Sequence, residues 1–410
     1  MALILLILLF LFPLLGMLKA LQHFRQPGGK FVIFCFYLLC AYILVPYSEG
    51  DIRLYEEKFN LISNLNFFEF LSYLVFNVFS QAGAGIEFYM ELNVFIVSRF
   101  TSNIAYCYCL TATVFFFLWN NILSNLIKEY DLKNSLQKNY GAIILICFVG
   151  AYVVFIRAIN GRFYLAYWIL LASAYNILIL GNRKYYWLLI STIFVHQAFL
   201  LLIVLVLFVD FSKVLYRQKK SEYILYGLII IGTVFSQSGL SVLTDYLQSF
   251  GGDFENKYSA YTKTSYVTSE AERDRKWFQV IRTPLLFYTL FANLLVCRFR
   301  YVKNLTTEEN KLYYLILIVF AINSFTINVP SFGDRYRNVL MGFIILLLAI
   351  LYSRYQLQRR NFLFFLLVVS FVFYKFVTIK MLENYISNWL LYPLSLFLHN
   401  IYGPVPISES

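Results

Sequence analysis

Charged residues are scarce in this 410-residue chain: only 14% of the residues are Asp, Glu, Lys or Arg, and 60% are hydrophobic. A soluble domain carries about 25% charged residues. Apolar runs of roughly 16 to 20 residues recur along the whole length, which is the length of a bilayer-crossing helix. The composition therefore predicts an all-α, polytopic integral membrane protein with about 11 to 13 transmembrane helices, some of them re-entrant or broken.

A soluble domain of useful size is also missing. The longest polar stretch, residues 241–280, is too short to bury a core of its own. The N-terminal run from Ala2 to Leu18 has neither a basic segment before it nor a small-residue cleavage site, so it is interpreted as a span and not as a signal peptide. The prediction is a single transmembrane domain over residues 1–410, with 241–280 as a loop within it that lies outside the membrane.

Patterns typical of metal, cofactor and nucleic-acid binding are absent. The six cysteines lie within or at the ends of apolar runs, and Cys107-x-Cys109 has no His or Cys neighbours that would complete a metal site. There is no Asp-x-Asp motif. The net charge of +12 comes from basic residues scattered between spans, which suits anionic lipid better than nucleic acid. The sequence predicts no metal, no cofactor and no nucleic-acid partner.

The apolar runs set the expected spans. Residues 69–100 form two short apolar stretches broken at Gly83-Ala84-Gly85, which favours a re-entrant or tilted hairpin, and an acidic loop is expected at 47–59. The other spans are expected near 2–19, 31–46, 103–121, 142–156, 163–180, 185–209, 222–240, 281–297, 312–328, 337–353 and 361–379.

The distribution of basic residues orients these spans. Lys and Arg total 18, against 5 acidic residues, in segments 20–30, 120–141, 181–186, 211–222, 298–311 and 354–360. They total 11, against 13 acidic residues, in segments 47–68, 157–162, 241–280, 329–337 and 381–410. Because basic loops stay in the cytoplasm, the first set is predicted to be cytoplasmic and the second to be outside, with both termini.

This arrangement requires residues 185–210 to return to the side that they left. The apolar run would have to break midway, and His196-Gln197 is the polar pair within it. A broken helix at membrane depth is tolerated where it lines a cavity. The sequence therefore predicts a break or turn near His196.

Two arginines, Arg157 and Arg162, lie between apolar runs with no carboxylate nearby in the sequence. A cation at the edge of hydrocarbon is costly unless it pairs or reaches water. Both could simply extend to lipid headgroups. Asn160-Gly161 between them favours a turn, which would direct both guanidinium groups toward one point where a pyrophosphate could bind.

Other polar residues are predicted to share this outer face. Carboxylates and a histidine suit deprotonation of a hydroxyl, and arginines suit phosphate oxygens. Each has a structural alternative: an exposed loop ion pair, a core histidine, a helix N-terminal acid or a headgroup anchor. The candidates for catalysis are Asp51, Glu87 and His196, and those for substrate binding are Arg53, Tyr55, Arg157, Arg162, Arg282, Arg335 and Arg337.

Part of this pattern resembles a known family. Residues 155–166, the basic turn at 182–184 and His196-Gln197-Ala198 resemble the EpsG-like group of Wzy polymerases, which has an outer arginine, a basic cytoplasmic turn and an H-x-[ST]-A element. The segments 50–55 and 85–89 are similar to its G-x-D-x-x-x-Y and E-x-G-Y elements. The resemblance covers roughly residues 45–215.

The resemblance implies a GT-C-like helical fold in a bacterial inner membrane, with its active site facing the periplasm. It implies polymerisation of undecaprenyl-pyrophosphate-linked oligosaccharide repeats into O-antigen or a related surface polysaccharide. In this hypothesis Arg157, Arg162 and Arg335 bind the pyrophosphate, and Asp51 or Glu87 binds the acceptor hydroxyl. The expected partners are the lipid-linked oligosaccharide, membrane lipids and a chain-length regulator protein. A flippase for the lipid-linked unit and an O-antigen ligase are the alternatives.

Overall fold

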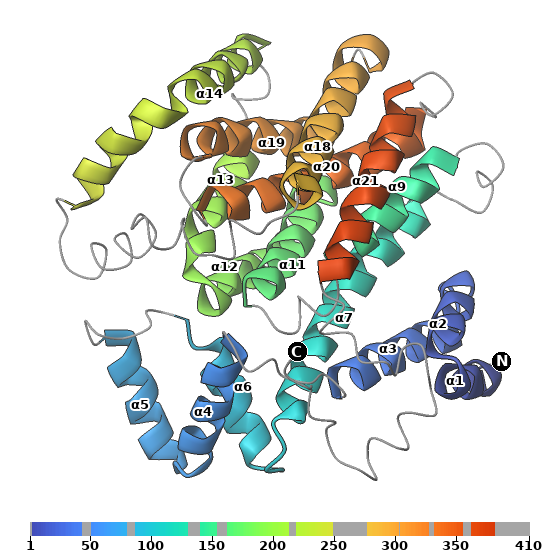
Figure 1. Ribbon diagram of the computed structural model, residues 1–410, viewed down its shortest axis with the longest axis vertical. Coiled ribbons are helices and arrows are strands. Elements are labelled where there is room, and N and C mark those ends of the chain that lie inside the picture. Colours follow the sequence, from blue (N-terminus) through green and yellow to red (C-terminus); the bar gives the residue numbers. More distant parts are fainter. Residues whose placement is uncertain are drawn as a thin grey trace.

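The chain folds into helices throughout the part that the structure describes. The computed structural model describes residues 2–42, 51–79, 87–129, 140–153, 162–212, 219–248, 277–302, 304–327, 332–355 and 362–381. Within these ranges the regular elements are all helices, and no strand is present (Figure 1). The all-α prediction is therefore confirmed for these residues.

The first apolar run forms two helices, so the prediction of a single span over 2–19 was wrong. α1 (Ala2–Leu11) ends where Phe12 leaves the helical conformation, and Pro13 begins α2 (Pro13–Gln22). Proline suits the first position of a helix because it lacks the amide hydrogen that would be unpaired there. Gly16 lies against the backbone of Leu9, so a Cβ at Gly16 would come within 2.5 Å of Leu9 Cα. This close approach lets α1 pack against α2.

The expected acidic loop at 47–59 is also corrected, because α4 (Asp51–Ser63) begins inside it. Phe59 and Ile62, three residues apart, are buried against α6 (Tyr89–Ser98) and form the apolar stripe of an amphipathic helix. The predicted pair of short apolar stretches is present as α5 (Phe67–Phe79) and α6, and the rings of Phe70 and Phe95 stack at 3.9 Å. The glycines between them lie outside the described residues.

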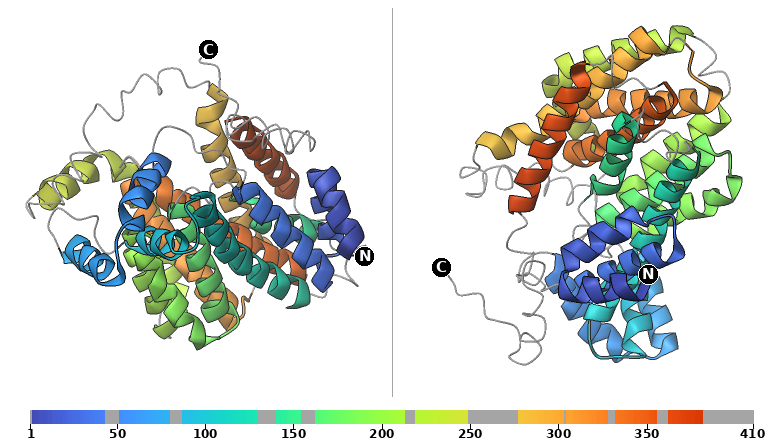
Figure 2. Two further views of the ribbon diagram at one scale, coloured as in Figure 1. Left: turned by 90° about the horizontal axis from the view of Figure 1, so that it is seen from below. Right: turned by 90° about the vertical axis from the view of Figure 1, so that its right-hand side faces the viewer.

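A long helix, α7 (Ala105–Glu129), connects this α4–α6 group with the larger helical body above it in Figure 1. α3 (Pro27–Tyr42) packs along α7. The two further views show α1–α3 on one flank of the body (Figure 2).

The larger body surrounds two nearly completely buried helices, α11 (Arg162–Ala174) and α20 (Phe332–Tyr355). α11 continues as a π-helical turn over Tyr175–Ile179. α9 packs against α20, α14 against α19, and α18 against α21. The remaining helices of the body are α9 (Tyr140–Ala151), α12 (Tyr186–Val195), α13 (Leu200–Phe211), α14 (Lys219–Gln248), α18 (Trp277–Val296), α19 (Thr307–Thr326) and α21 (Phe362–Met381).

Four described helices are long and apolar enough to cross a membrane: Ala105–Lys128, Arg162–Ile179, Val280–Tyr301 and Gly333–Tyr355. Seven shorter apolar helices of 10–17 residues accompany them. The chain therefore has the character of a helical membrane protein, while the number of about 11 to 13 crossings stays a prediction. A polar loop was expected over 241–280, but α14 extends to Gln248 and α18 begins at Trp277, so both ends of that segment are helical; the residues between them lie outside the described part.

Side-chain contacts join the segments with basic excess to one another, which is what their predicted location on one side requires. The contacts are Lys30 Nζ to Ser124 Oγ at 2.8 Å, Asn121 Nδ2 to the Tyr185 hydroxyl at 2.9 Å, Lys311 Nζ to Asp210 Oδ1 at 2.7 Å, Arg298 Nη2 to Glu222 Oε2 at 2.9 Å and Arg354 Nη1 to Glu309 Oε1 at 2.9 Å. Asp210 directly precedes segment 211–222, and the other residues lie within the segments with basic excess. The location of these segments on one side of a membrane, and which side that is, stay predictions.

Candidate active site

The apolar run 185–210 breaks at His196, as its sequence predicted. α12 ends at Val195, His196 is extended with φ −157° and ψ 108°, a 3-10 turn covers Gln197–Phe199, and α13 follows. The hydroxyl of Tyr186, at the start of α12, binds the carboxylate of Asp210, near the end of α13. The two ends of the run therefore meet, and the run turns back on itself.

A carboxylate from another part of the chain stabilises this break. In a continuous helix the amide of Gln197 would donate to the carbonyl four residues earlier. Here it donates to Glu87 Oε1 at 2.9 Å. The amide of Phe88 donates to the carbonyl of Phe194 at 3.1 Å, which ties the two segments together. Glu87 thus caps the second half of the broken helix. The first amides of a helix have no partner within it, so at a buried helix start another group must accept their hydrogen bonds.

The same carboxylate gathers two further candidates. His196 Nδ1 lies 2.7 Å from Glu87 Oε1, and Arg162 Nη1 lies 2.7 Å from Glu87 Oε2. The side chain of Glu87 is 6% exposed, whereas those of His196 and Arg162 are 14% and 26% exposed. Three residues chosen independently from the sequence, 75 and 109 positions apart, therefore form one cluster at the junction of the α4–α6 group and the larger body.

The environment of Glu87 favours its ionised form. Burial alone raises the pKa of this carboxyl, but the hydrogen bond and charge of His196, the charge of Arg162 and the amide of Gln197 together lower it below its ordinary value of 4.5. An ionised carboxylate with three donors is well satisfied despite its burial. Glu87 is therefore an acceptor of hydrogen bonds and not a source of protons.

Aromatic rings and a second arginine border the cluster. The rings of Phe163 and Phe199 lie 6.0 and 5.9 Å from the imidazole of His196. The guanidinium of Arg335, on the first turn of α20, lies 5.7 Å from the Phe163 ring. The hydroxyl of Tyr336 donates to the carbonyl of Ala198 at 3.2 Å, which fixes α20 against the turn after His196. The result is a largely apolar wall with a cation at its edge.

Two other candidate arginines, Arg337 and Arg282, contact residues outside the Glu87 cluster. Arg337 pairs with Asp334 at 3.1 Å, one helical turn away on α20. The guanidinium of Arg282, on α18, lies 5.9 Å from the ring of Tyr374. Neither of these contacts involves Glu87, so among the described residues Arg282 and Arg337 are not part of the cluster.

Four candidates are not placed. Arg157 lies outside the described residues, so the predicted turn that would direct it toward Arg162 is not tested. Asp51, Arg53 and Tyr55 belong to the first two turns of α4, and their side chains lie outside the described part.

Several members of the site could not be recognised from the sequence. The backbone amide of Gln197 leaves no signal in a side-chain pattern, although its position directly after His196 in the expected break was a clue. Phe163 and Tyr336 follow Arg162 and Arg335 directly, so each arginine has an aromatic neighbour that positions the cluster. Among 43 Phe and 34 Tyr residues, such positions cannot be recognised without the fold.

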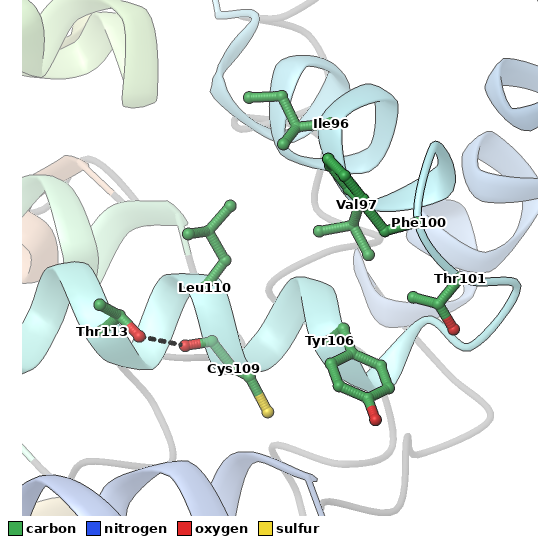
Figure 3. A pocket seen from close by; sticks show the side chains of 8 residues that line it. All are labelled: Ile96, Val97, Phe100, Thr101, Tyr106, Cys109, Leu110 and Thr113. Atoms are coloured by element: carbon green, nitrogen blue, oxygen red, sulfur yellow. Dashed lines mark hydrogen bonds between the residues drawn. The ribbon is translucent and has the colours of Figure 1, made fainter.

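A hollow of about 330 Å³ lies elsewhere, between α6 and α7 (Figure 3). Its lining, from Ile96 to Thr113, is almost entirely apolar, and Thr113 donates its hydroxyl to the carbonyl of Cys109 at 2.9 Å. The described residues hold no group of three metal-ligating side chains. The cluster around Glu87, and not this hollow, is the better candidate for chemistry.

The fold and the cluster define a class: a helical membrane protein with a carboxylate, a histidine and an arginine gathered at a broken helix. Comparison of the chain with protein-family models, with curated proteins and with solved structures finds no match. The proposed function therefore rests on the Glu87 cluster.

Proposed function

We propose that this protein is a glycosyltransferase that joins undecaprenyl-pyrophosphate-linked oligosaccharide repeat units into O-antigen or a related surface polysaccharide at the periplasmic face of a bacterial inner membrane. The observation that carries the proposal is the convergence of Glu87, Arg162 and His196 at the break of the apolar run. A protein that only anchors or scaffolds would not need a buried acid, an imidazole and a cation in one place.

The chemistry of this reaction suits the cluster. In the proposed reaction the growing chain on its lipid pyrophosphate is the donor, and a hydroxyl of a new lipid-linked unit is the acceptor. Pyrophosphate is a good leaving group, so catalysis needs positioning and stabilisation of charge more than an acid on the leaving side. The acceptor side needs a group that takes up a proton.

The arginines proposed to bind the pyrophosphate lie beside the Glu87 cluster where the structure describes them. Arg335 lies against Phe163, whose ring faces His196, and Arg162 binds Glu87. Guanidinium groups bind phosphate oxygens bidentately. We assign Arg335, Arg162 and Arg157 to the pyrophosphate as part of the proposal. A GT-C-like architecture and a chain-length regulator partner belong to the same proposal.

The test is the polysaccharide ladder of a strain in which the gene is deleted. A polymerase leaves a product capped with a single repeat, a flippase leaves no repeat, and a ligase leaves long unligated chains. The single-repeat phenotype, restored to a full ladder by the wild-type gene, is the expected result. Either of the other two phenotypes would overturn the assignment.

Asp51→Asn tests the other candidate carboxylate in the same strain. If Asp51 holds the acceptor, the ladder is lost while the protein still inserts at the wild-type level, which immunoblotting of membranes measures. A full ladder would make Asp51 an ordinary residue of α4 and leave the acceptor side to the Glu87 cluster. Glu56→Gln, on the same helix, is the matched control.

A further inference from the structure

The cluster contains two groups that could take a proton from the acceptor hydroxyl, Glu87 and His196, and the structure distinguishes them. We propose that Nε2 of His196 accepts this proton, and that Glu87 is the positioning residue that fixes the imidazole in the required tautomer. The inference rests on the proposed function and assigns the roles within its site.

Glu87 is poorly placed to act on a substrate. Its oxygen Oε1 accepts hydrogen bonds from His196 Nδ1 and from the amide of Gln197, and its oxygen Oε2 accepts one from Arg162. Its side chain is 6% exposed, less than half the exposure of His196. These contacts also lower the pKa of Glu87 below 4.5, which makes the carboxylate a weak proton acceptor at neutral pH.

The tautomer follows from the hydrogen-bonding capacity of the groups. An ionised carboxylate has no hydrogen to donate. The 2.7 Å contact between Glu87 Oε1 and His196 Nδ1 therefore requires a hydrogen on Nδ1. In neutral imidazole only one nitrogen carries hydrogen, so Nε2 holds an unshared electron pair. A carboxylate on one imidazole nitrogen is a general means of orienting the other.

The surroundings of the ring leave Nε2 available. Within the described ranges no hydrogen bond involves Nε2 of His196. Phe163 and Phe199 flank the ring and offer it no polar atom. Among the described residues, Glu87 and Arg162 are the charged groups in the cluster. Arg335 and Tyr164 lie beyond Phe163, Tyr336 contacts the carbonyl of Ala198, and Tyr89, Glu91 and Tyr167 are on the neighbouring helices.

The proposed step is balanced as follows. The acceptor hydroxyl oxygen forms a bond to the anomeric carbon of the donor as its proton passes to His196 Nε2. The bond between that carbon and the pyrophosphate oxygen breaks, and the lipid pyrophosphate leaves with the electron pair. Glu87 stabilises the positively charged imidazolium until its proton passes to water.

The decisive variant is His196→Asn, assayed as the purified full-length protein with a lipid-pyrophosphate-linked repeat unit. The Asn amide nitrogen can occupy the position of Nδ1 and keep the contact with Glu87, while nothing replaces Nε2. The polymerisation rate should fall by about 10²- to 10⁴-fold, as expected for loss of a general base. His23→Ala, at the turn between α2 and α3, is the matched control and should keep the wild-type rate.

Glu87→Gln tests the positioning role through the separate effects on kcat and KM. Loss of the carboxylate removes the negative charge that stabilises the imidazolium formed during the reaction, so kcat should fall while KM for the lipid-linked acceptor changes little. Glu91→Gln removes a buried carboxylate one turn along, which pairs with Lys58, and should leave kcat unchanged. An unchanged kcat in Glu87→Gln would show that Glu87 does not act through His196.

A spectroscopic measurement identifies the tautomer of His196 independently of enzymatic activity. The chain has three histidines, so protein labelled with ¹⁵N-histidine gives few signals, and the signal absent from His196→Asn is that of His196. Nδ1 should carry the hydrogen at neutral pH, and Nε2 should be bare. A hydrogen on Nε2 alone, or a His196→Asn protein that polymerises normally, overturns the inference. A wild-type protein that does not polymerise overturns the proposed function.

Discussion

Arg162 lies beside Glu87 in a geometry that a lysine cannot reproduce. Its Nη1 contacts Glu87 Oε2 at 2.7 Å, and a planar guanidinium can bind a second anion at the same time. Lysine keeps the charge and loses the planar fork. Arg162→Lys should therefore lower polymerisation by about tenfold or more at unchanged expression, as seen in the length and intensity of the ladder.

Arg99→Lys is the matched control for this change. Among the described residues Arg99 donates to the carbonyls of Ile62 and Ser63 and to the hydroxyl of Ser98, and its guanidinium lies over the ring of Phe95. If Arg157→Lys and Arg162→Lys both give normal ladders, the two arginines are headgroup anchors and the phosphate role assigned to them is wrong.

Glu87 should also make the stability of the protein depend on pH. Because its folded pKa is below the ordinary 4.5, its contribution is fully present above pH 4.5 and is lost as pH falls through the lower, folded pKa. The thermal unfolding midpoint of wild-type protein in detergent should exceed that of Glu87→Gln at pH 6 and above. This difference should shrink below pH 4.5.

The exposed Glu69 provides the comparison for that experiment. It caps α5 by exchanging hydrogen bonds with Asn66, and Glu69→Gln should change the midpoint much less than Glu87→Gln. A Glu87→Gln protein as stable as wild type at neutral pH would show that the buried cluster contributes nothing to folding.

The break at His196 predicts that the two ends of the run 185–210 lie on the same side of the membrane. Asn182 precedes α12 and Ser212 follows α13, and the contact between Tyr186 and Asp210 brings these ends together. In a protein whose six native cysteines are replaced, single cysteines at 182 and 212 should react with an impermeant maleimide from the same side.

A cysteine at Asp334, an exposed position at the opposite end of the body, should react from the other side. If 182 and 212 react from opposite sides, the run crosses the membrane, and the site at its turn would not exist in the membrane-embedded protein.

Some elements could be predicted from the sequence and others could not, for physical reasons. The break at His196 was predictable because charge bias required a return and the polar pair His196-Gln197 lay near the middle of the run. The helix α4 was missed because its charges suggested a loop, while its apolar stripe of Phe59 and Ile62 has meaning only against α6. The turn at Phe12 was missed because ten-residue apolar helices look like one longer run.

The site divides in the same way. Glu87, Arg162 and His196 were identifiable as polar residues in apolar surroundings, where each is rare. Their mutual contacts were not, because they depend on long-range packing between α6, α11 and α12. Whether Arg157 joins them stays a prediction.

Three ion pairs join helices at the end of the larger body that lies opposite the Glu87 cluster. Asp210 pairs with Lys311, Glu222 with Arg298 and Glu309 with Arg354, and they link α13, α14, α19, α20 and the turn after α18. Removal of one partner of a buried ion pair leaves a charge without its counter-ion, which costs about 3 to 5 kcal/mol. Arg298→Met should therefore destabilise strongly, as measured by thermal unfolding in detergent.

The double variant Glu222→Gln with Arg298→Met should recover part of this loss, because it removes the carboxylate that has lost its counter-ion and keeps the hydrogen bond from Tyr313. Lys19→Met removes an exposed cation whose ammonium donates to the side chain of Gln22, and it should change the midpoint little. Equal effects of Arg298→Met and Lys19→Met would show that the pair is not desolvated.

The long separation between Glu87 and its partners has a consequence for biosynthesis. Glu87 leaves the ribosome 75 residues before Arg162 and 109 residues before His196. During that interval its carboxylate has no partner from this cluster, so the hairpin that carries it gains little from burial and stays in contact with water. The α4–α6 group should therefore reach its final position late, after α12 has been synthesised. A nascent chain arrested before residue 162 should leave position 87 open to labelling that the complete protein resists.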